Sequence, residues 1–323
     1  MTSYIIRRLL IAIPVLFFMI LAAFVLIQAM PGGPFDAVGE RAMPEEMRQL
    51  LERRYGLDDP VYVQFARYMG NLLQGDLGPI LRIRSQTVND IVAQTFPVSF
   101  QLGGMALLLA FVIGIPAGII AALYHNSPVD YSATFFAVLG VSIPSLVLGP
   151  VLILIFGVYL DWFPIAFWGA EPPFILGLFP RLTADFFWHA ALPVFTLGTG
   201  GSAIIARLTR AGLLDVLDQD YIRTARAKGL RERAVIAVYA LKNSLIPVVT
   251  LLGPLLAGYL TGSLVTETIF ALNGMGRAYV GSVNSREYFL LTSLTLVYGA
   301  MLILGNLLVD IMYAWLDPRI RYD

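Results

Sequence analysis

The chain has 323 residues, of which 58% are hydrophobic and only 14% are charged. Soluble domains carry about 25% charged residues, so this composition cannot supply a polar surface for a water-exposed globule and predicts an integral membrane protein. There is no cysteine and there are two histidines, which excludes disulfide frameworks and cysteine-ligated metals, and no metal site is predicted. The formal net charge of zero excludes a strongly basic nucleic-acid binder.

The first long apolar run covers residues 9–29 and follows Arg7 and Arg8. A helix rises 1.5 Å per residue, so about 20 residues cross a hydrocarbon core about 30 Å thick. The apolar part of a signal peptide has about 7–15 residues, which is shorter than this run. Residues 1–29 are therefore predicted to be an N-terminal tail and a retained transmembrane helix.

Residues 30–97 contain most of the sequence that does not suit a membrane. Charged pairs such as Glu45-Glu46 and Arg53-Arg54 occur among short amphipathic stretches, of which 61–73 is one. Because these residues follow the first span and precede the next apolar run, we predict a small external domain here.

Five further apolar runs complete the predicted all-α membrane fold of six transmembrane helices: 98–123, 132–158, 189–205, 245–269 and 289–315. The fourth span is the weakest, because several glycines dilute it. The pairs Gly114/Gly118 and Gly258/Gly262 each place small residues on one helix face, which suits close helix packing. Prolines inside the spans, including Pro144, predict kinks that are lined by protein or water rather than lipid.

The distribution of positive charge predicts the orientation. With the N-terminus inside, the four cytoplasmic segments hold 12 Lys and Arg, whereas the two short external segments hold three. Residues 30–97 form too long a segment to count. Both termini are therefore predicted in the cytoplasm. The core domain would be 98–316, with a cytoplasmic loop at 206–244, and the cytoplasmic tail would be 317–323.

The cytoplasmic loop contains the most informative segment of the chain. Asp218 or Asp220 can cap the start of a short helix, Arg226 and Lys228 can complement its C-terminal dipole, and Gly229 can adopt the left-handed conformation that ends it. About three turns are predicted, roughly 15 Å long, which is too short to cross a membrane. A second helical stretch, 231–244, must then lead into the fifth span.

This short helix has three ordinary explanations: a topology anchor, a surface helix that touches anionic lipid, and a docking element for a soluble partner. Positive residues are expected on the cytoplasmic side in any case, which favours the anchor. Small residues among the charges, Thr224, Ala225 and Ala227, suit insertion into a groove better than contact with lipid. The residues alone leave all three open.

Residues 221–230, Tyr-Ile-Arg-Thr-Ala-Arg-Ala-Lys-Gly-Leu, resemble the cytoplasmic EAA loop of binding-protein-dependent ABC importer permeases, in the form found in the dipeptide/oligopeptide/nickel branch. Arg223-Thr224-Ala225 takes the place of Glu-Ala-Ala, and Gly229 takes the place of the loop's glycine. Further segments that are similar to the B-type subunit of this branch are 4–14, 31–34, 55–60, 75–78, 96–97, 267–270, 274–277 and 316–321. The resemblance covers nearly the whole chain.

The resemblance implies a type I ABC importer permease of the bacterial inner membrane. Its implied partners are a homologous C-type permease that completes the pore, two ABC ATPase subunits and an extracytoplasmic peptide-binding protein. The short helix would be the coupling helix, lodged in a groove of an ATPase subunit, and its residues would be Asp220, Tyr221, Arg223, Thr224, Ala225, Arg226, Ala227, Lys228 and Gly229. ATP-driven closure of the ATPase pair would move two such helices together and turn the pore outward.

The chain is not expected to hydrolyse ATP itself. A phosphate-binding loop needs Gly-x-x-x-x-Gly-Lys followed by Ser or Thr, but the two lysines, Lys228 and Lys242, follow Ala227 and Leu241. No catalytic residue and no cofactor are therefore predicted for this chain, and ATP and Mg²⁺ would be bound by partner subunits.

Two acids lie within the predicted spans, and intramembrane acids are candidates for function. Glu267 could contact the pore mouth or the binding protein, or it could be a structural interfacial carboxylate. Asp310 lies four residues after Asn306, on the same helix face, and a structural role is favoured. An ion-coupled secondary transporter would be expected to place several acids near the midplane, so this alternative and a membrane enzyme are disfavoured.

The sequence does not determine the substrate. Permeases of this branch serve dipeptides, oligopeptides, nickel chelates or glutathione, and specificity is expected to lie mostly in the binding protein. A polar, extended substrate fits spans that hold few fixed charges, which favours peptides.

Overall fold

The computed structural model describes residues 2–29, 35, 44–81, 86–170, 172 and 174–316. Within these ranges the chain forms helices α1 to α14 and two π-helical segments, η1 and η2, and no β-strand. The predicted cytoplasmic tail, 317–323, and most of residues 30–43 lie outside the described residues. The predicted all-α class is confirmed in the part of the chain that is described.

Five helices or helix pairs are long and apolar enough to cross a membrane. They are α1 (Thr2–Gln28), α4 (Val88–Leu123), α7 (Ala184–Leu217), α11 (Ile246–Leu260) with α12 (Leu264–Ile269), and α14 (Tyr288–Leu316). The third predicted span is built from α5 (Pro128–Ser142), α6 (Ser145–Leu152) and η1 (Ile153–Tyr159), and it gives the sixth crossing if this bent unit counts as one.

The third span, predicted for 132–158 with a kink at Pro144, is broken into separate helices at that proline. Its two halves are bent by 100°. Ile143 adopts an extended conformation with φ −86° and ψ 111°, and Pro144 follows with ψ 141°. The cause is local, because a proline ring disfavours the helical conformation of the preceding residue and removes a backbone donor.

Two other spans have helix limits that differ from the predicted ones. α4 starts at Val88, ten residues before the predicted span, so the boundary drawn at 97/98 falls inside a continuous helix. α7 runs on to Leu217, so the first third of the predicted loop 206–244 is helical. The added N-terminal turns of α4 pack on Met275 and on Leu290 of α14 through Val88, and the added C-terminal turns of α7 pack on Ala122 of α4 through Leu213.

Glycines allow the close approach of α4 and α7. A Cβ atom on Gly114 would lie 2.7 Å from the Ser202 carbonyl oxygen, and one on Gly118 would lie 2.5 Å from that of Ala206. The packing role predicted for this pair is therefore confirmed. Gly258 has open space beside it, so the same role is wrong for the pair that it forms with Gly262.

Three helices lie at the external end: α2 (Glu45–Tyr55), α3 (Val61–Leu72) and α13 (Met275–Ser285). α3 packs against membrane helices, because the ring of Phe65 lies 5.7 Å from that of Phe17 and 5.4 Å from that of Phe24 on α1. The buried Tyr68 hydroxyl and the Ser293 hydroxyl on α14 form a hydrogen bond of 3.0 Å. This part of 30–97 is thus built onto the membrane helices.

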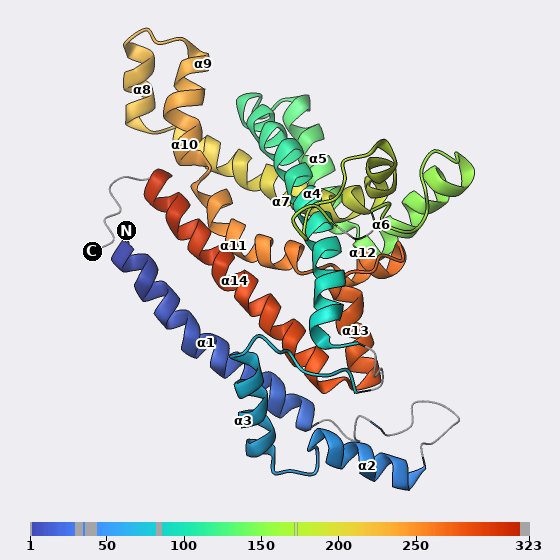
Figure 1. Ribbon diagram of the computed structural model, residues 1–323. Helices are drawn as coiled ribbons and strands as arrows, with labels where there is room; N and C mark the ends of the chain where they lie inside the picture. Colours follow the sequence, from blue (N-terminus) through green and yellow to red (C-terminus); the bar gives the residue numbers. More distant parts are fainter. Residues whose placement is uncertain are drawn as a thin grey trace.

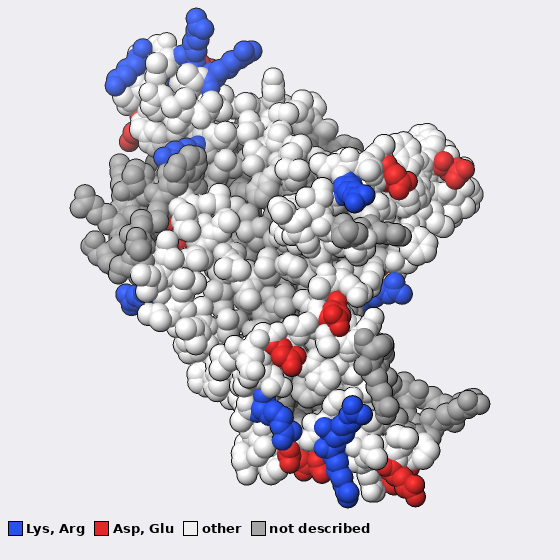
Figure 2. Space-filling view, viewed as in Figure 1, with Lys and Arg blue, Asp and Glu red and all other residues white. Residues whose placement is uncertain are grey.

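The opposite end carries a helical hairpin. It comprises α8 (Asp220–Ala227), α9 (Glu232–Ala234), η2 (Val235–Ala240) and α10 (Leu241–Ser244). α1 begins and α14 ends towards this same end (Figure 1). Lys and Arg side chains gather over α8 and α9, both signs of charge occur around α2 and α3, and the surface between is largely uncharged (Figure 2). The positive-inside rule assigns the α8 end to the cytoplasm.

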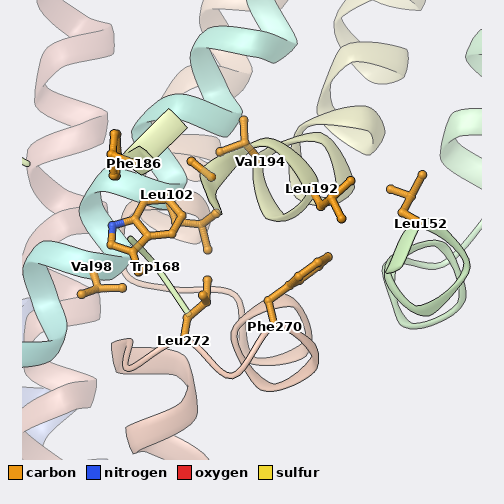
Figure 3. Packing of buried hydrophobic residues seen from close by; sticks show 10 residues of the cluster. Val98, Leu102, Leu152, Trp168, Phe186, Leu192, Val194, Phe270 and Leu272 are labelled. Carbon is orange, nitrogen blue, oxygen red and sulfur yellow. The ribbon is translucent and has the colours of Figure 1, made fainter. Parts of the chain in front are cut away.

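A buried apolar cluster ties the external loops to the membrane helices. The cluster contains Trp168 together with side chains from α4, α6, α7 and the loop after α12, which are Val98, Leu102, Leu152, Phe186, Leu192, Val194, Phe270 and Leu272 (Figure 3). Trp168 Nε1 donates to Gln101 Oε1 at 2.7 Å, and Gln101 Nε2 donates to the Leu178 carbonyl at 2.7 Å. The loop between η1 and α7 is therefore fixed onto α4.

Candidate functional site: the α8 hairpin

α8 occupies the segment for which a short cytoplasmic helix is predicted. It has eight residues, about 12 Å, so it is shorter than the predicted three turns. The expected aspartate cap is wrong, because Gln219 is the N-cap, without a side-chain capping bond, and Asp220 is the first helical residue. The predicted left-handed stop is confirmed, since Gly229 has φ +75°.

The inner face of α8 is buried against the chain's own helices. Ile222 is fully buried and Ala225 is 4% exposed. They pack with Ala122 of α4, Leu213 of α7, and Val235 of η2. Ala225, one of the residues predicted for the coupling helix, therefore faces the chain's own core. The sequence prediction did not include Ile222. Its position as a β-branched apolar residue among charged ones was the signal that could have indicated a buried inner face.

The outer face of α8 is polar and open. The exposed residues are Asp220, Tyr221, Arg223, Thr224, Arg226, Ala227, Lys228 and Gly229, with Leu230 beyond them. Thr224 donates its hydroxyl to the Asp220 carbonyl at 2.9 Å, which ties it to its own helix. Eight of the nine residues predicted for the coupling helix are thus exposed, and only Ala225 is buried.

Two contacts brace α8 against the return segment. The Arg226 guanidinium reaches both carboxylate oxygens of Glu232 on α9, at 2.7 and 3.2 Å. This pairing holds the pKa of Glu232 below its ordinary value and raises that of Arg226. Asn243 Nδ2 donates to the Tyr221 hydroxyl at 3.0 Å. The hairpin is therefore a folded unit with a fixed outer face.

The hairpin is continuous with two membrane helices. α7 leads into α8 through Asp218 and Gln219, and α10 leads directly into α11. A Cβ atom on Gly212 of α7 would lie 2.4 Å from the Ser244 carbonyl oxygen of α10, so the two arms of the hairpin touch at its base. A force on α8 therefore acts on the cytoplasmic ends of both α7 and α11.

Comparison with known proteins shows which family the chain belongs to. Residues 114–322 match the family model described as binding-protein-dependent transport system inner membrane component, and residues 1–103 match the model of its N-terminal region. The chain belongs to this family. The resemblance predicted from the sequence is therefore confirmed, and the chain is an inner membrane permease.

The similarity to named relatives covers nearly the whole length of the permease. It is 42% identical over 322 residues to the oligopeptide transport system permease protein OppB of Haemophilus influenzae, with 100% of both chains covered. It is 44% identical over 298 residues to the dipeptide transport system permease protein DppB of Bacillus subtilis, covering 92% of this chain and 91% of that protein.

A solved structure shares the fold. A chain of the inward-facing MetNI methionine ABC transporter matches with a TM-score of 0.53 and 15% identity, covering 69% of this permease and 94% of that chain. The predicted type I ABC permease fold is therefore confirmed.

Glu267 has no exposed surface in this permease with which to contact a binding protein, which favours the structural alternative. Its side chain is fully buried. Ser99 Oγ donates to one carboxylate oxygen at 2.7 Å, and the backbone N–H of Arg277 donates to the other at 2.9 Å. Cβ atoms on Gly262 and Gly274 would lie 2.6 and 2.3 Å from its carboxyl group. Glu267 joins α4, α12 and α13 as a structural carboxylate.

Asp310 has the structural role that is favoured for it. Arg8 Nη2 on α1 lies 3.0 Å from both carboxylate oxygens of Asp310 on α14. Asn306 faces a different helix, since its Oδ1 would lie 2.2 Å from a Cβ on Gly253 of α11. In the sequence analysis Arg8 contributed only to the positive charge on the cytoplasmic side. Its contact with Asp310 could not be predicted, because the two residues are 302 positions apart and leave no local pattern.

Proposed function

We propose that this permease forms half of a peptide pathway through the inner membrane and that ATP hydrolysis on separate subunits drives transport. The observation that carries the proposal is the α8 hairpin, which presents a folded, accessible outer face while its inner face is packed on α4 and α7. The peptide substrate is supported by the names of the relatives, which are oligopeptide and dipeptide transport permeases.

Of the three explanations for the short helix, the structure favours docking. A helix that lies on lipid turns an apolar face to the membrane, but the apolar residues of α8, Ile222 and Ala225, face the chain's own core. An anchor needs only positive charge, whereas here the helix is braced by Arg226 and Asn243. The outer face, with Arg223 and Lys228, suits a groove that carries carboxylates.

The remaining partners follow from the proposed role. A homologous C-type permease would supply the other half of the pore, two ABC ATPase subunits would each receive a coupling helix, and an extracytoplasmic binding protein would deliver peptide. ATP and Mg²⁺ would be bound by the ATPase subunits. Closure of the ATPase pair would displace both α8 hairpins and reorient the pore, which is a rigid-body transition between two states.

An ion-coupled secondary transporter is the second class to consider. Such carriers need acids that can exchange protons or sodium near the midplane. Glu267 is held by Ser99 and by backbone donors, and Asp310 is paired with Arg8. The two acids singled out for function are thus engaged in structural contacts, which favours the ATP-driven class. Nickel chelate or glutathione stays an alternative substrate.

Transport by the reconstituted complex tests the proposal. The permease, its C-type partner, the ATPases and the binding protein are placed in proteoliposomes with a labelled peptide. We expect uptake that requires ATP and stops when the ATPase glutamate that activates water is replaced. Uptake that survives this replacement and follows a proton gradient would refute the ATP-driven mechanism. Mass spectrometry of the ligand on the binding protein would separate peptides from nickel chelate and glutathione.

A further inference from the structure

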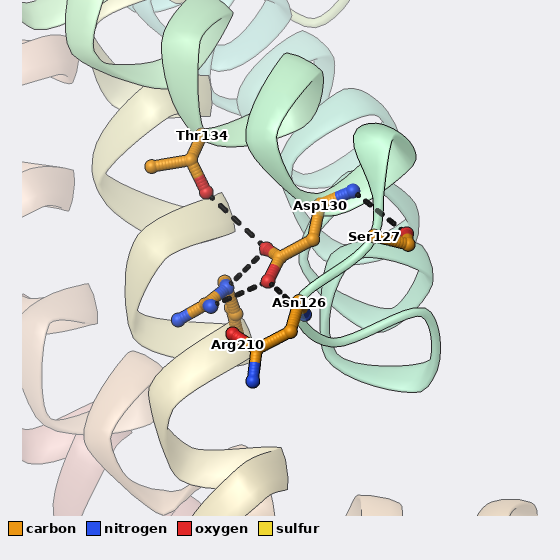
Figure 4. A network of polar contacts seen from close by, with 5 residues as sticks. All are labelled: Asn126, Ser127, Asp130, Thr134 and Arg210. Carbon is orange, nitrogen blue, oxygen red and sulfur yellow. Dashed lines mark hydrogen bonds and ion pairs between the residues drawn. The ribbon is translucent and has the colours of Figure 1, made fainter.

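An ion pair that contains a buried carboxylate joins two membrane helices near the cytoplasmic end. Asp130, in the first turn of α5, is 1% exposed, and Arg210 lies on α7. Arg210 donates from Nε to Oδ1 at 2.6 Å and from Nη2 to Oδ2 at 2.7 Å, which is a two-point contact (Figure 4). The backbone N–H of Asn126 and the hydroxyl of Thr134 also donate to this carboxylate.

The carboxylate is not required to cap its own helix. Ser127 is the N-cap of α5, and its side chain accepts from the backbone N–H of Asp130. The Asp130 side chain is therefore free to reach across to α7, as Figure 4 shows. Two-point contacts between arginine and carboxylate fix direction as well as distance, so this pair sets the position of α5 relative to α7.

Asp130 is the one buried residue of α5. An open pocket of about 200 Å³ is lined by α4, α5 and α7, and its walls include Ala133 and Ala137 of α5 and Ala203 and Ala206 of α7. The ion pair is therefore the contact that buries a side chain of α5 against α7 at this end.

α5 is also a short rigid segment with a turn or a break at each end. Asn126, just before it, has φ +60°. The bend at Ile143-Pro144 separates it from α6. Such a segment moves as a body with whatever holds its cytoplasmic end.

The same part of α7 holds the α8 hairpin. Leu213 follows Arg210 by three residues, about one helical turn, and is fully buried in the cluster that contains Ile222 of α8. The chain of contacts thus runs from α8 through Leu213 and Arg210 to Asp130. This is a contiguous physical route between the proposed docking helix and the third span.

We propose that Asp130 and Arg210 are positioning residues for transport: their ion pair makes α5 move with α7 and α8, so that the third span follows the docking helix. The inference rests on the proposed function. It goes beyond that function by adding the third span to the moving unit and naming the two side chains that attach it.

The first test measures ATP hydrolysed per peptide transported by the whole complex in proteoliposomes. Asp130→Asn leaves the half-buried Arg210 guanidinium without its charge partner, so both stability and coupling should fall. The double variant Asp130→Asn/Arg210→Gln has no unpaired charge at this contact. We expect its thermal stability to return towards that of the unmodified complex, while ATP consumed per peptide stays raised by about two- to thirtyfold, the range of coupling effects of 0.5–2 kcal/mol.

Two further variants complete this test. Asp310→Asn removes a different arginine–aspartate pair, between α1 and α14, and should leave ATP consumed per peptide unchanged. Arg210→Lys keeps the charge but loses the two-point geometry, and should give an intermediate ratio. A double variant that recovers the normal ratio together with its stability would show that the pair is merely structural and would overturn the inference, as would an equal effect of Asp310→Asn.

The second test needs no disruptive variant. Because the chain has no cysteine, spin labels can be placed at Val129 on α5 and Asp215 on α7, which are both exposed. With cysteine-free partners, we expect the same distance in the nucleotide-free and vanadate-trapped complexes. A label pair on Arg7 of α1 and Arg223 of α8 should change distance. A changed 129–215 distance would overturn the inference, whereas an unchanged 7–223 distance would instead contradict the proposed function.

Discussion

The attachment of α8 to the membrane domain can be tested by shortening its one large buried side chain. Ile222 is fully buried among Ala122, Leu213, Val235 and Ala240. Removing a buried isoleucine side chain down to alanine costs about 2–5 kcal/mol. Because α8 is short, the loss acts on local detachment of the hairpin, and Ile222→Ala should raise the detached fraction by about thirtyfold to several thousandfold.

Limited proteolysis with trypsin measures this detachment. α8 and the turn after it carry four exposed cleavage sites, Arg223, Arg226, Lys228 and Arg231. The rate of cleavage follows the open population when closing is fast relative to cleavage, so Ile222→Ala should be cut much faster within this segment.

Val238→Ala provides the matched control. It removes a similar apolar side chain from the same hairpin, but Val238 is 65% exposed, so the tryptic rate should stay within about twofold of normal. Equal cleavage of the Ile222→Ala and unmodified permeases, with both inserted in the membrane, would refute the inward orientation of Ile222. In the full complex, Ile222→Ala should also retain ATPase binding through the outer face but transport less peptide per ATP.

Three other predictions concern single contacts. Gly229→Ala should destabilise the end of α8 by about 1–2 kcal/mol, because φ +75° disfavours a side chain even in open space; hydrogen exchange measures this, with the more tolerant Gly229→Asn as control. Glu267→Ala should lower the melting temperature of the detergent-solubilised permease, since Ser99 and a backbone donor lose their acceptor at about 1–3 kcal/mol each, whereas an unchanged value would contradict the buried role. Arg226 lowers the pKa of Glu232, so their contact stabilises the hairpin at pH values above the pKa of Glu232 in the unfolded chain. This stabilisation is lost as the pH falls through the lower pKa that Glu232 has in the folded chain. Tryptic cleavage of α8 should therefore rise slightly on acidification, and Glu232→Gln should remove this pH dependence.

Much of the fold could be predicted because it depends on local pattern. Apolar runs of membrane length gave the spans, and the asymmetry of Lys and Arg gave the orientation. Within the candidate site, the position of the short helix and its left-handed stop at Gly229 followed from residue types alone. Helix limits were less accurate, since tertiary contacts extend α4 at Val88 and α7 at Leu213 beyond their apolar stretches.

The errors share a physical cause. Whether Ala225 faces a partner or the chain's own core depends on where α4, α7 and η2 lie, and the sequence around Ala225 contains none of them. Glu267 reads as an interfacial acid until Ser99 and the backbone of Arg277 surround it. For the third span the sequence predicted a kink but not a bend of 100°, because Pro144 determines where the helix is interrupted but not the angle between its two halves.

The sequence by itself determined that this is a membrane protein with six apolar spans, a short charged helix between the fourth and fifth spans and no phosphate loop of its own, because composition, run length and motif are properties of neighbouring residues. Only the tertiary structure decided which face of that helix is available and which side chains bind it to α4 and α7. Asp130 and Arg210 lie 80 residues apart, so no local pattern could pair them. Their contact exists because the packing of α4, α5 and α7 brings a buried carboxylate within reach of a guanidinium.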